Sequence, residues 1–514
     1  MYMRRIIFCF FLLVSAFFVG CSGEENETSV NDLQQDVVSN ISKNETENRE
    51  IDVSAAEKNP NANVGATVVI GEKLKDKEAD SEDETAAPSR QKNDITRTIM
   101  IYMVGSDLES QYGSGTVDIL EIMNSGIDLS KNNVLLYTGG TTEWWLSVIP
   151  SNRNVIYELG EDGFSLVDKQ RALNMGDSDT LEKFLKYGKA NYPAEQFGLI
   201  LWDHGGGPMV GYGVDEKTGD CLDMSEIVEA LDDSGFKGES KLEFLGFDAC
   251  LMGAVETGWN IKDNAKYMIA SQETEPGWGW NYAFLSELRY CEDGEDIGKE
   301  IIDYYIEAGE EFFDEDPYCW TDLTLSCVDL SKITELERAI NELYGEIVPK
   351  LNSGYFAKVS RARNNTKAFG KFTASTSYDL VDLGDMVSFL TSDYGDETEA
   401  LLQALDEFVC YSKTNVTDAT GVSIFYPYDN RDCMSGWVKM YEEFDFAPNY
   451  AKYLQQFAKM LQKTTFLCME YDAKYSGNRY SNRRRKSDDV SIDTGADGGL
   501  CVFPIYHPAQ GGRQ

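Results

Sequence analysis

The sequence predicts an α/β fold in which a mainly parallel sheet carries helices on both faces. Short apolar runs rich in β-branched and aromatic residues alternate along the chain with amphipathic helical patterns. This alternation indicates βαβ units, because parallel neighbouring strands need a crossover connection. The pattern begins abruptly at Thr98, after a long polar stretch in which no aromatic residue occurs between Phe18 and Tyr102.

The predicted elements follow in a simple order. Strands are expected within 98–105, 132–140, 197–203, 241–248 and 265–270, with a side hairpin at 154–168. Helical periodicity predicts helices at 178–192, 223–235 and 251–261. From 286 to 446 helical patterns dominate, with strands at 321–330 and 421–427, and this stretch is expected to pack on the sheet as a helical addition.

The first residues have the layout of a bacterial lipoprotein signal peptide. Arg4 and Arg5 precede an apolar run from 6 to 19. This run is shorter than the roughly 20 residues of a transmembrane helix. Small or apolar residues before Cys21 resemble a lipobox, so Cys21 is the expected lipidation site and the membrane an expected partner. The alternatives are an ordinary cleaved signal or an uncleaved anchor. The expected location is extracytoplasmic, at the cell surface or in the periplasm.

Four segments are therefore expected. Residues 1–21 are the signal peptide, and 22–95 form an acidic tether that is too poor in apolar residues to fold. Residues 96–446 form the main folded domain. Residues 447–514 form a C-terminal appendage, expected to be short and β-rich and without an assigned role.

Charge and cysteine spacing exclude some functions. The chain has 46 Lys and Arg against 88 Asp and Glu, a net charge of −42. Such a chain repels nucleic acid and suits basic substrates. The 11 cysteines include no CxxC pair, so no metal site is expected. A monomer that requires no cofactor is the simplest expectation.

Two candidate catalytic residues follow apolar strands. His204, one of two histidines in the chain, ends the run "LILWDH", and Cys250 ends "LEFLGFDAC". If these strands are neighbours, both side chains project from the carboxyl edge of the sheet, where α/β folds bind ligands. A thiol beside an imidazole can act as a nucleophile with its proton carrier. The alternative is a loop histidine and an inert buried cysteine.

The glycines after His204 fit the same chemistry. Gly205 and Gly206 would let backbone N–H groups approach a developing oxyanion. The residues after Cys250 are expected to enter a helix, whose N-terminus would lower the pKa of the thiol. Asp203 is adjacent to His204 and is left out of the catalytic set, because successive side chains at a strand end point apart.

The motifs "WDHGGG", "GFDACLMGAVET" and "ASQETEPGWGW", in this order, resemble the clostripain family of cysteine peptidases, relatives of gingipain, legumain and caspase. The opening "IYMVGSDLES" is also similar. The resemblance is close over about 98–280 and looser through "YDLVDLGDMVSFL" and "TGVSIFYP". It implies a caspase-like three-layer α/β/α sandwich and a peptidase domain over 96–446.

The resemblance also implies roles for residues. His204 would be the general base and acid, Cys250 the nucleophile that forms an acyl-enzyme, and Gly205 part of the oxyanion hole. Family members cleave after Arg or Lys, and Asp248 matches the acid beneath the substrate's basic side chain. The alternative for Asp248 is to orient His204 or to cap a helix. The loop at 271–280 would wall the pocket through Gln272, Glu273 and Trp278, or else pack as a structural loop.

Self-cleavage between the histidine and the cysteine is common in the family. Lys217 is the only basic residue between His204 and Lys237, and it is the candidate site; the alternative is an ordinary loop lysine. Calcium is an activator that the resemblance allows, although no DxDxDG loop occurs. Two other functions stay open: an inactive relative that captures basic peptides at the surface, and another Cys–His acyltransferase.

Overall fold

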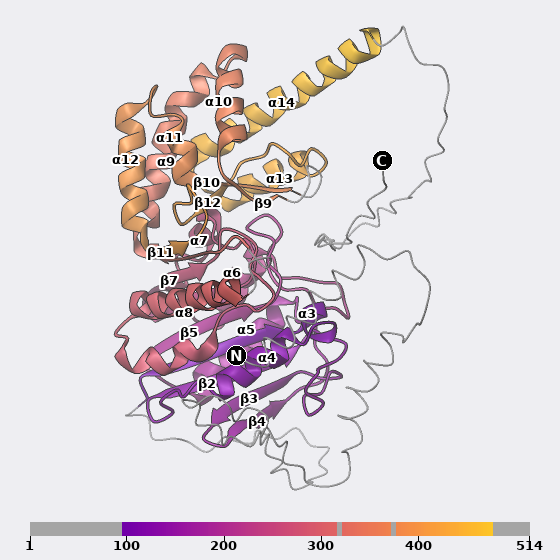
Figure 1. Cartoon of the computed structure of the whole chain (residues 1–514), viewed down its shortest axis with the longest axis vertical. Helices are drawn as coiled ribbons and strands as arrows, with labels where there is room; N and C mark the ends of the chain where they lie inside the picture. Colours follow the sequence, from indigo (N-terminus) through magenta and orange to yellow (C-terminus); the bar gives the residue numbers. More distant parts are fainter. Residues whose placement is uncertain (1–94, 316–320, 372–376, 476–514) are drawn as a thin grey trace, which may run out of the picture.

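A nine-stranded mixed sheet forms the centre of the protein (Figure 1). The computed structural model describes residues 95–315, 321–371 and 377–475. The strand order is β11-β8-β7-β6-β5-β1-β2-β3-β4. The five strands β7, β6, β5, β1 and β2 pair in parallel, and the strands at both edges are antiparallel. The strands are β1 Arg97–Val104, β2 Asn132–Gly139, β3 Val155–Gly160, β4 Gly163–Lys169, β5 Gln196–Trp202, β6 Leu242–Asp248, β7 Ala265–Ala270, β8 Thr324–Asp329 and β11 Val409–Thr414.

Helices cover both faces of this sheet, as the sequence predicts. Alternate residues of β1 enter different cores: Tyr102 joins the cluster beneath α5 and α6, and Ile101 joins the cluster beneath α4 and α8. This division confirms the α/β fold with helices on both faces. The helices of these layers are α3 Ser106–Ser110, α4 Ser114–Met123, α5 Ser178–Asn191, α6 Met224–Asp233, α7 Val255–Ile261 and α8 Gly294–Glu315.

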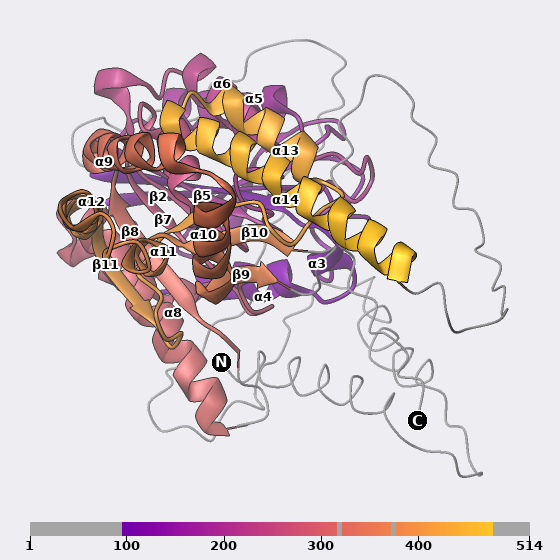
Figure 2. The same ribbon diagram turned by 90° about the horizontal axis from the view of Figure 1, so that it is seen from above.

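A smaller antiparallel sheet and a group of helices lie beside the end of the large sheet that carries β11, at the top of Figure 1 and facing the viewer in Figure 2. Its order is β12-β10-β9, and a bridge between Ala254 and Ser423 joins it to the segment after β6. Its strands are β9 Ala368–Lys371, β10 Ser377–Asp382 and β12 Ser423–Phe425. The helices are α9 Ile333–Ile347, α10 Ser353–Asn365, α11 Leu383–Ser388, α12 Gly395–Phe408, α13 Met434–Met440 and α14 Pro448–Tyr475. The residues after 286 were expected to pack on the large sheet as a helical addition. They do so in part, through α8, and they also form this second sheet with its own helices.

The expected boundary at 446 is wrong. The long helix α14 begins at Pro448, where a β-rich appendage was expected to start. Tyr450, Tyr453 and Phe457 are fully buried and make ring contacts with one another and with Tyr344 of α9. Aromatic side chains at helical spacing thus tie this helix into the main core.

The helix after Cys250 also differs from the expectation. It begins at Val255, and Leu251 takes a left-handed conformation with φ of +66°. Cys250 is therefore not at a helix N-terminus, and the helix dipole does not act on its thiol as expected. The signal sequence, Cys21, the tether up to residue 94 and His507 lie outside the described residues. Within the described part of the chain, no helix is both long and apolar enough to span a bilayer.

Candidate active site

Strands β5 and β6 bring the two candidate catalytic residues to one edge of the sheet. The strands pair in parallel with Trp202 opposite Asp248, so His204 and Cys250 follow at the same offset. A Cβ placed on Gly205 would lie 2.1 Å from the carbonyl oxygen of Cys250. The backbone after His204 thus rests directly on the backbone of Cys250, which only a glycine permits.

His204 is held by a carboxylate that the sequence did not reveal. Its Nε2 lies 2.7 Å from Oδ1 of Asp107, at the start of α3. Burial favours the neutral ring, but the hydrogen bond to Asp107 and the charges of Asp203 and Asp107 outweigh it and raise the pKa of His204. The pair orients the imidazole and supports its protonated form.

The Asp203 carboxylate bonds to the Ser106 hydroxyl and to the main-chain N–H groups of Val214 and His204, in keeping with its expected place outside the catalytic pair. Its Oδ1 accepts from the Ser106 hydroxyl at 2.5 Å, and its Oδ2 accepts from the Val214 N–H at 2.5 Å. Burial raises the pKa of Asp203 to about 7. The residue fastens the loop after β5 to α3, which carries Asp107.

The surroundings of Cys250 favour the thiol over the thiolate. Burial, with the charge of Glu275 adding to it, raises the pKa of the thiol to about 12. The Glu275 N–H lies 3.3 Å from the sulfur, and the Gly205 N–H also acts on it as a hydrogen-bond donor. Because the thiolate is disfavoured at rest, attack on a substrate requires His204 to remove the proton as the bond forms.

Asp248 lies beneath this pair and is almost completely buried. Its Oδ1 accepts from the Trp280 N–H at 3.1 Å, and its Oδ2 accepts from the Tyr282 hydroxyl at 2.9 Å. The helix that Asp248 would cap in its alternative role, α7, begins only at Val255, and its N-cap residue is Ala254. Its partners belong to the loop and turn after β7, which the sequence analysis placed at the substrate pocket.

The three loop residues expected to line that pocket are engaged elsewhere. Gln272 is buried, donates to Asp382 at 2.9 Å and accepts from the Gly421 N–H at 3.1 Å. Glu273 accepts from the Gly370 N–H at 3.0 Å. These bonds join the loop to the smaller sheet.

Trp278 stacks on Phe312 of α8 with ring centroids 4.6 Å apart. These contacts are those of the alternative in which Gln272, Glu273 and Trp278 belong to a structural loop. That the three residues line a substrate pocket stays a prediction. Glu275 of the same loop, which was not selected from the sequence, places its N–H 3.3 Å from the Cys250 sulfur. This contact depends on how the loop folds back toward Cys250, and no sequence pattern indicates it.

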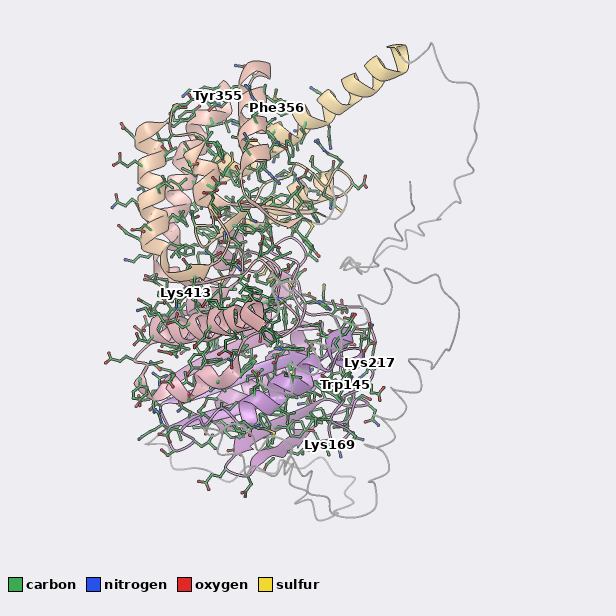
Figure 3. The ribbon with its side chains drawn as sticks, in the orientation of Figure 1. Trp145, Lys169, Lys217, Tyr355, Phe356 and Lys413 are labelled. Atoms are coloured by element: carbon green, nitrogen blue, oxygen red, sulfur yellow. The ribbon has the colours of Figure 1, made fainter. Side chains whose placement is uncertain are left out.

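Lys217 lies in a turn at the side of the molecule near α3 (Figure 3). Asp215 Oδ1 accepts from the N–H groups of Lys217 and Thr218, and the Lys217 ammonium contacts the Ser151 carbonyl. Glu216 accepts from the Ser110 hydroxyl of α3 at 3.0 Å. The candidate cleavage segment is therefore folded as a turn and is bonded to the helix that holds Asp107.

Comparison with known proteins places this site in a family. The model of the clostripain family matches residues 101–463, which is well over half of the chain. The chain belongs to the clostripain family of cysteine peptidases. The matched range contains His204, Cys250 and most of α14, which agrees with the burial of that helix.

Clostripain itself, from Hathewaya histolytica, is 26% identical over 307 residues, which are 49% of this chain and 57% of that protein. The chain thus aligns with little more than half the length of this curated relative. A secreted cysteine protease from Bacteroides thetaiotaomicron, solved with an irreversible peptide inhibitor, matches 70% of this chain and 99% of its own at 17% identity and a TM-score of 0.55. An inactive zymogen of a protease from Parabacteroides distasonis matches 70% of this chain and 97% of its own, at 18% identity and a TM-score of 0.51. These likenesses support the clostripain-family fold.

Activity without a metal or cofactor stays a prediction. Among the described residues, no group of three or more His, Cys, Asp and Glu side chains is arranged to hold a metal ion. Activation by calcium stays a prediction.

Proposed function

We propose that this clostripain-family protein is an extracytoplasmic, lipid-anchored endopeptidase that cleaves after Arg or Lys. The observation that carries the peptidase activity is the arrangement at the carboxyl edge of β5 and β6. His204, bonded to Asp107, follows one strand, and Cys250, in backbone contact with Gly205, follows the next. Nothing in this arrangement favours the inactive relative or another acyltransferase.

The reaction proceeds through an acyl-enzyme. His204 takes the thiol proton as the Cys250 sulfur attacks the scissile carbonyl carbon, and the carbonyl oxygen becomes an oxyanion near the Gly205 N–H. His204 then gives the proton to the leaving amine as the peptide bond breaks. Water, activated by the same imidazole, releases the acyl group. Asp107 stabilises the imidazolium that forms in each half of the cycle.

Specificity is proposed to come from Asp248. The P1 residue, which precedes the scissile bond, would place its cationic end at this buried carboxylate beneath the nucleophile. A buried charge accepts a cation and penalises neutral side chains that leave it unpaired. Lipidation at Cys21 and the extracytoplasmic location rest on the N-terminal sequence alone.

A panel of matched fluorogenic peptides tests this function. Protein lacking residues 1–95 is assayed on substrates that end in Arg, Lys, Asp or Asn, with and without calcium. We expect cleavage after Arg and Lys only, and a fall of at least about 100-fold in kcat/KM for both in Asp248→Asn, since a charge-assisted contact is lost. Cleavage of the Asn peptide, or an Arg preference unchanged in Asp248→Asn, would contradict the specificity proposal.

Self-cleavage is proposed at Lys217. The peptide bond after Lys217 is in a hydrogen-bonded turn, so the turn must open before it can enter an active site. Purified wild-type protein is expected to yield two fragments that meet at Lys217 and Thr218, as read by intact mass. Lys217→Ala is expected to stay intact, with Lys237→Ala processed normally as the matched control. A Lys217→Ala chain that is cut at the same rate, or is intact and fully active, would remove the activation proposal.

A further inference from the structure

Glu275 reaches both the nucleophile and the acid beneath it. Its N–H lies 3.3 Å from the Cys250 sulfur, and its carboxyl hydrogen-bonds with that of Asp248. The Trp280 indole N–H lies 3.4 Å from Glu275 Oε1. The residue thus links the reacting sulfur to the base of the proposed pocket.

Two carboxyl groups can share a hydrogen bond only when one of them carries a proton. Burial, together with the charge of Asp248 and the bond between them, raises the pKa of Glu275 well above its usual value. The second oxygen, Oε2, is buried and meets no donor among the described residues. The pair therefore keeps one ionisable proton in a buried site.

We propose that Glu275 is a second specificity residue, which binds a cationic P1 side chain together with Asp248 and releases the shared proton when it does so. The inference rests on the proposed preference for Arg and Lys. The proton leaves the Glu275 carboxyl for solvent, and the P1 cation takes its place between two carboxylates. No bond to carbon forms or breaks in this exchange.

Two carboxylates in one pocket favour a guanidinium over an ammonium. A guanidinium offers five N–H donors in a plane and can bond to both acids at once, whereas an ammonium is a compact charge with three donors. Arg at P1 is therefore expected to be cleaved faster than Lys, and this difference is assigned to Glu275.

Because binding releases a proton, the affinity of the pocket for a basic P1 side chain should increase with pH. A cation binds best when the pair is already ionised, so affinity for a basic P1 side chain rises with pH through the raised pKa of the pair. The groups that face Glu275 are Asp248, Trp280 and the buried Tyr305 hydroxyl of α8, with the Cys250 thiol at its main chain. Without the Glu275 proton to release, the acid limb of kcat/KM is expected to move to lower pH.

The decisive assay compares substrates that end in Arg and in citrulline, its neutral isostere. In Glu275→Gln we expect kcat/KM for Arg to fall at least about 10-fold, mainly through KM, with citrulline changed by less than about 2-fold. Glu275→Asp should restore part of the Arg rate. Glu307→Gln, an exposed acid on α8, is the charge-matched control and should match wild type. An Arg-to-citrulline ratio and an acid limb that both stay at wild-type values in Glu275→Gln would overturn the inference.

A second measurement leaves Glu275 in place. Benzamidine, a small amidinium, is titrated into Cys250→Ala protein by calorimetry in buffers of different ionisation enthalpy. We expect proton release on binding near neutral pH; binding without proton release from pH 5 to 8 would overturn the inference. If wild-type enzyme cleaves neither Arg nor Lys peptides, the proposed function itself fails. If it cleaves them while Glu275→Gln keeps the wild-type ratio, only the role of Glu275 fails.

Discussion

Replacing Cys250 with alanine is expected to lower kcat/KM on basic peptides by at least about 10³-fold, because no acyl-enzyme can form without the thiol. The fold should survive, since the side chain is only partly buried and its removal leaves the β5–β6 pairing intact. The measurement is hydrolysis of an Arg peptide by wild type and variant at equal folded concentration.

Cys433→Ala provides the matched control, because this cysteine is free and exposed, far along the chain from the site. It should keep wild-type activity and wild-type sensitivity to alkylating agents. Full activity in Cys250→Ala would mean that another group is the nucleophile.

Gly205→Ala is the second change with a large expected effect. The added Cβ would meet the Cys250 carbonyl oxygen at 2.1 Å and the Cys250 nitrogen at 3.1 Å, so backbone must move. A displacement of about 1 Å at reacting groups lowers rate by about 100-fold. Overpacking of this kind also lowers the free energy of unfolding by roughly 1–3 kcal/mol.

Gly436→Ala separates the two effects, because no atom lies within 4 Å of a Cβ at that position in α13. It should retain activity and stability. Activity is read with the Arg peptide, and stability by thermal unfolding of the same samples. A Gly205→Ala enzyme with unchanged kcat would show that the close approach of these two loops is not needed for catalysis.

The sequence predicted the catalytic pair because both residues end continuous apolar runs. His204 and Cys250 follow strands whose pairing places Trp202 beside Asp248, so one shared offset brings them together. The parallel sheet itself fixes this geometry, and the pattern of apolar runs was enough to predict it.

Asp107 and Glu275 could not be found in the same way. Asp107 precedes His204 by 97 positions and reaches it only because α3 starts at the end of β1. Glu275 turns back on Cys250 through a loop whose course depends on bonds to the smaller sheet. Contacts of this kind depend on tertiary structure and leave no periodic signal along the chain.

Two boundaries were misjudged for physical reasons. The helix after Cys250 begins at Val255, although the apolar periodicity predicted a start at 251. Leu251 adopts a φ of +66°, which an α-helix does not allow. The helix α14 was missed because its tyrosines pack against α9, a partner about 100 positions earlier in the chain. In both cases tertiary contacts outweigh local propensity.

The most direct test of the central claim is to map a covalent adduct. Full-length protein is incubated with an irreversible peptidyl inhibitor carrying Arg at P1, and in parallel with the same inhibitor carrying Asp, before digestion and mass spectrometry. We expect a single adduct on the Cys250 sulfur, formed with the Arg inhibitor and suppressed by an excess of Arg peptide. An adduct on another cysteine, or equal labelling of Cys250 by the Asp inhibitor, would contradict it.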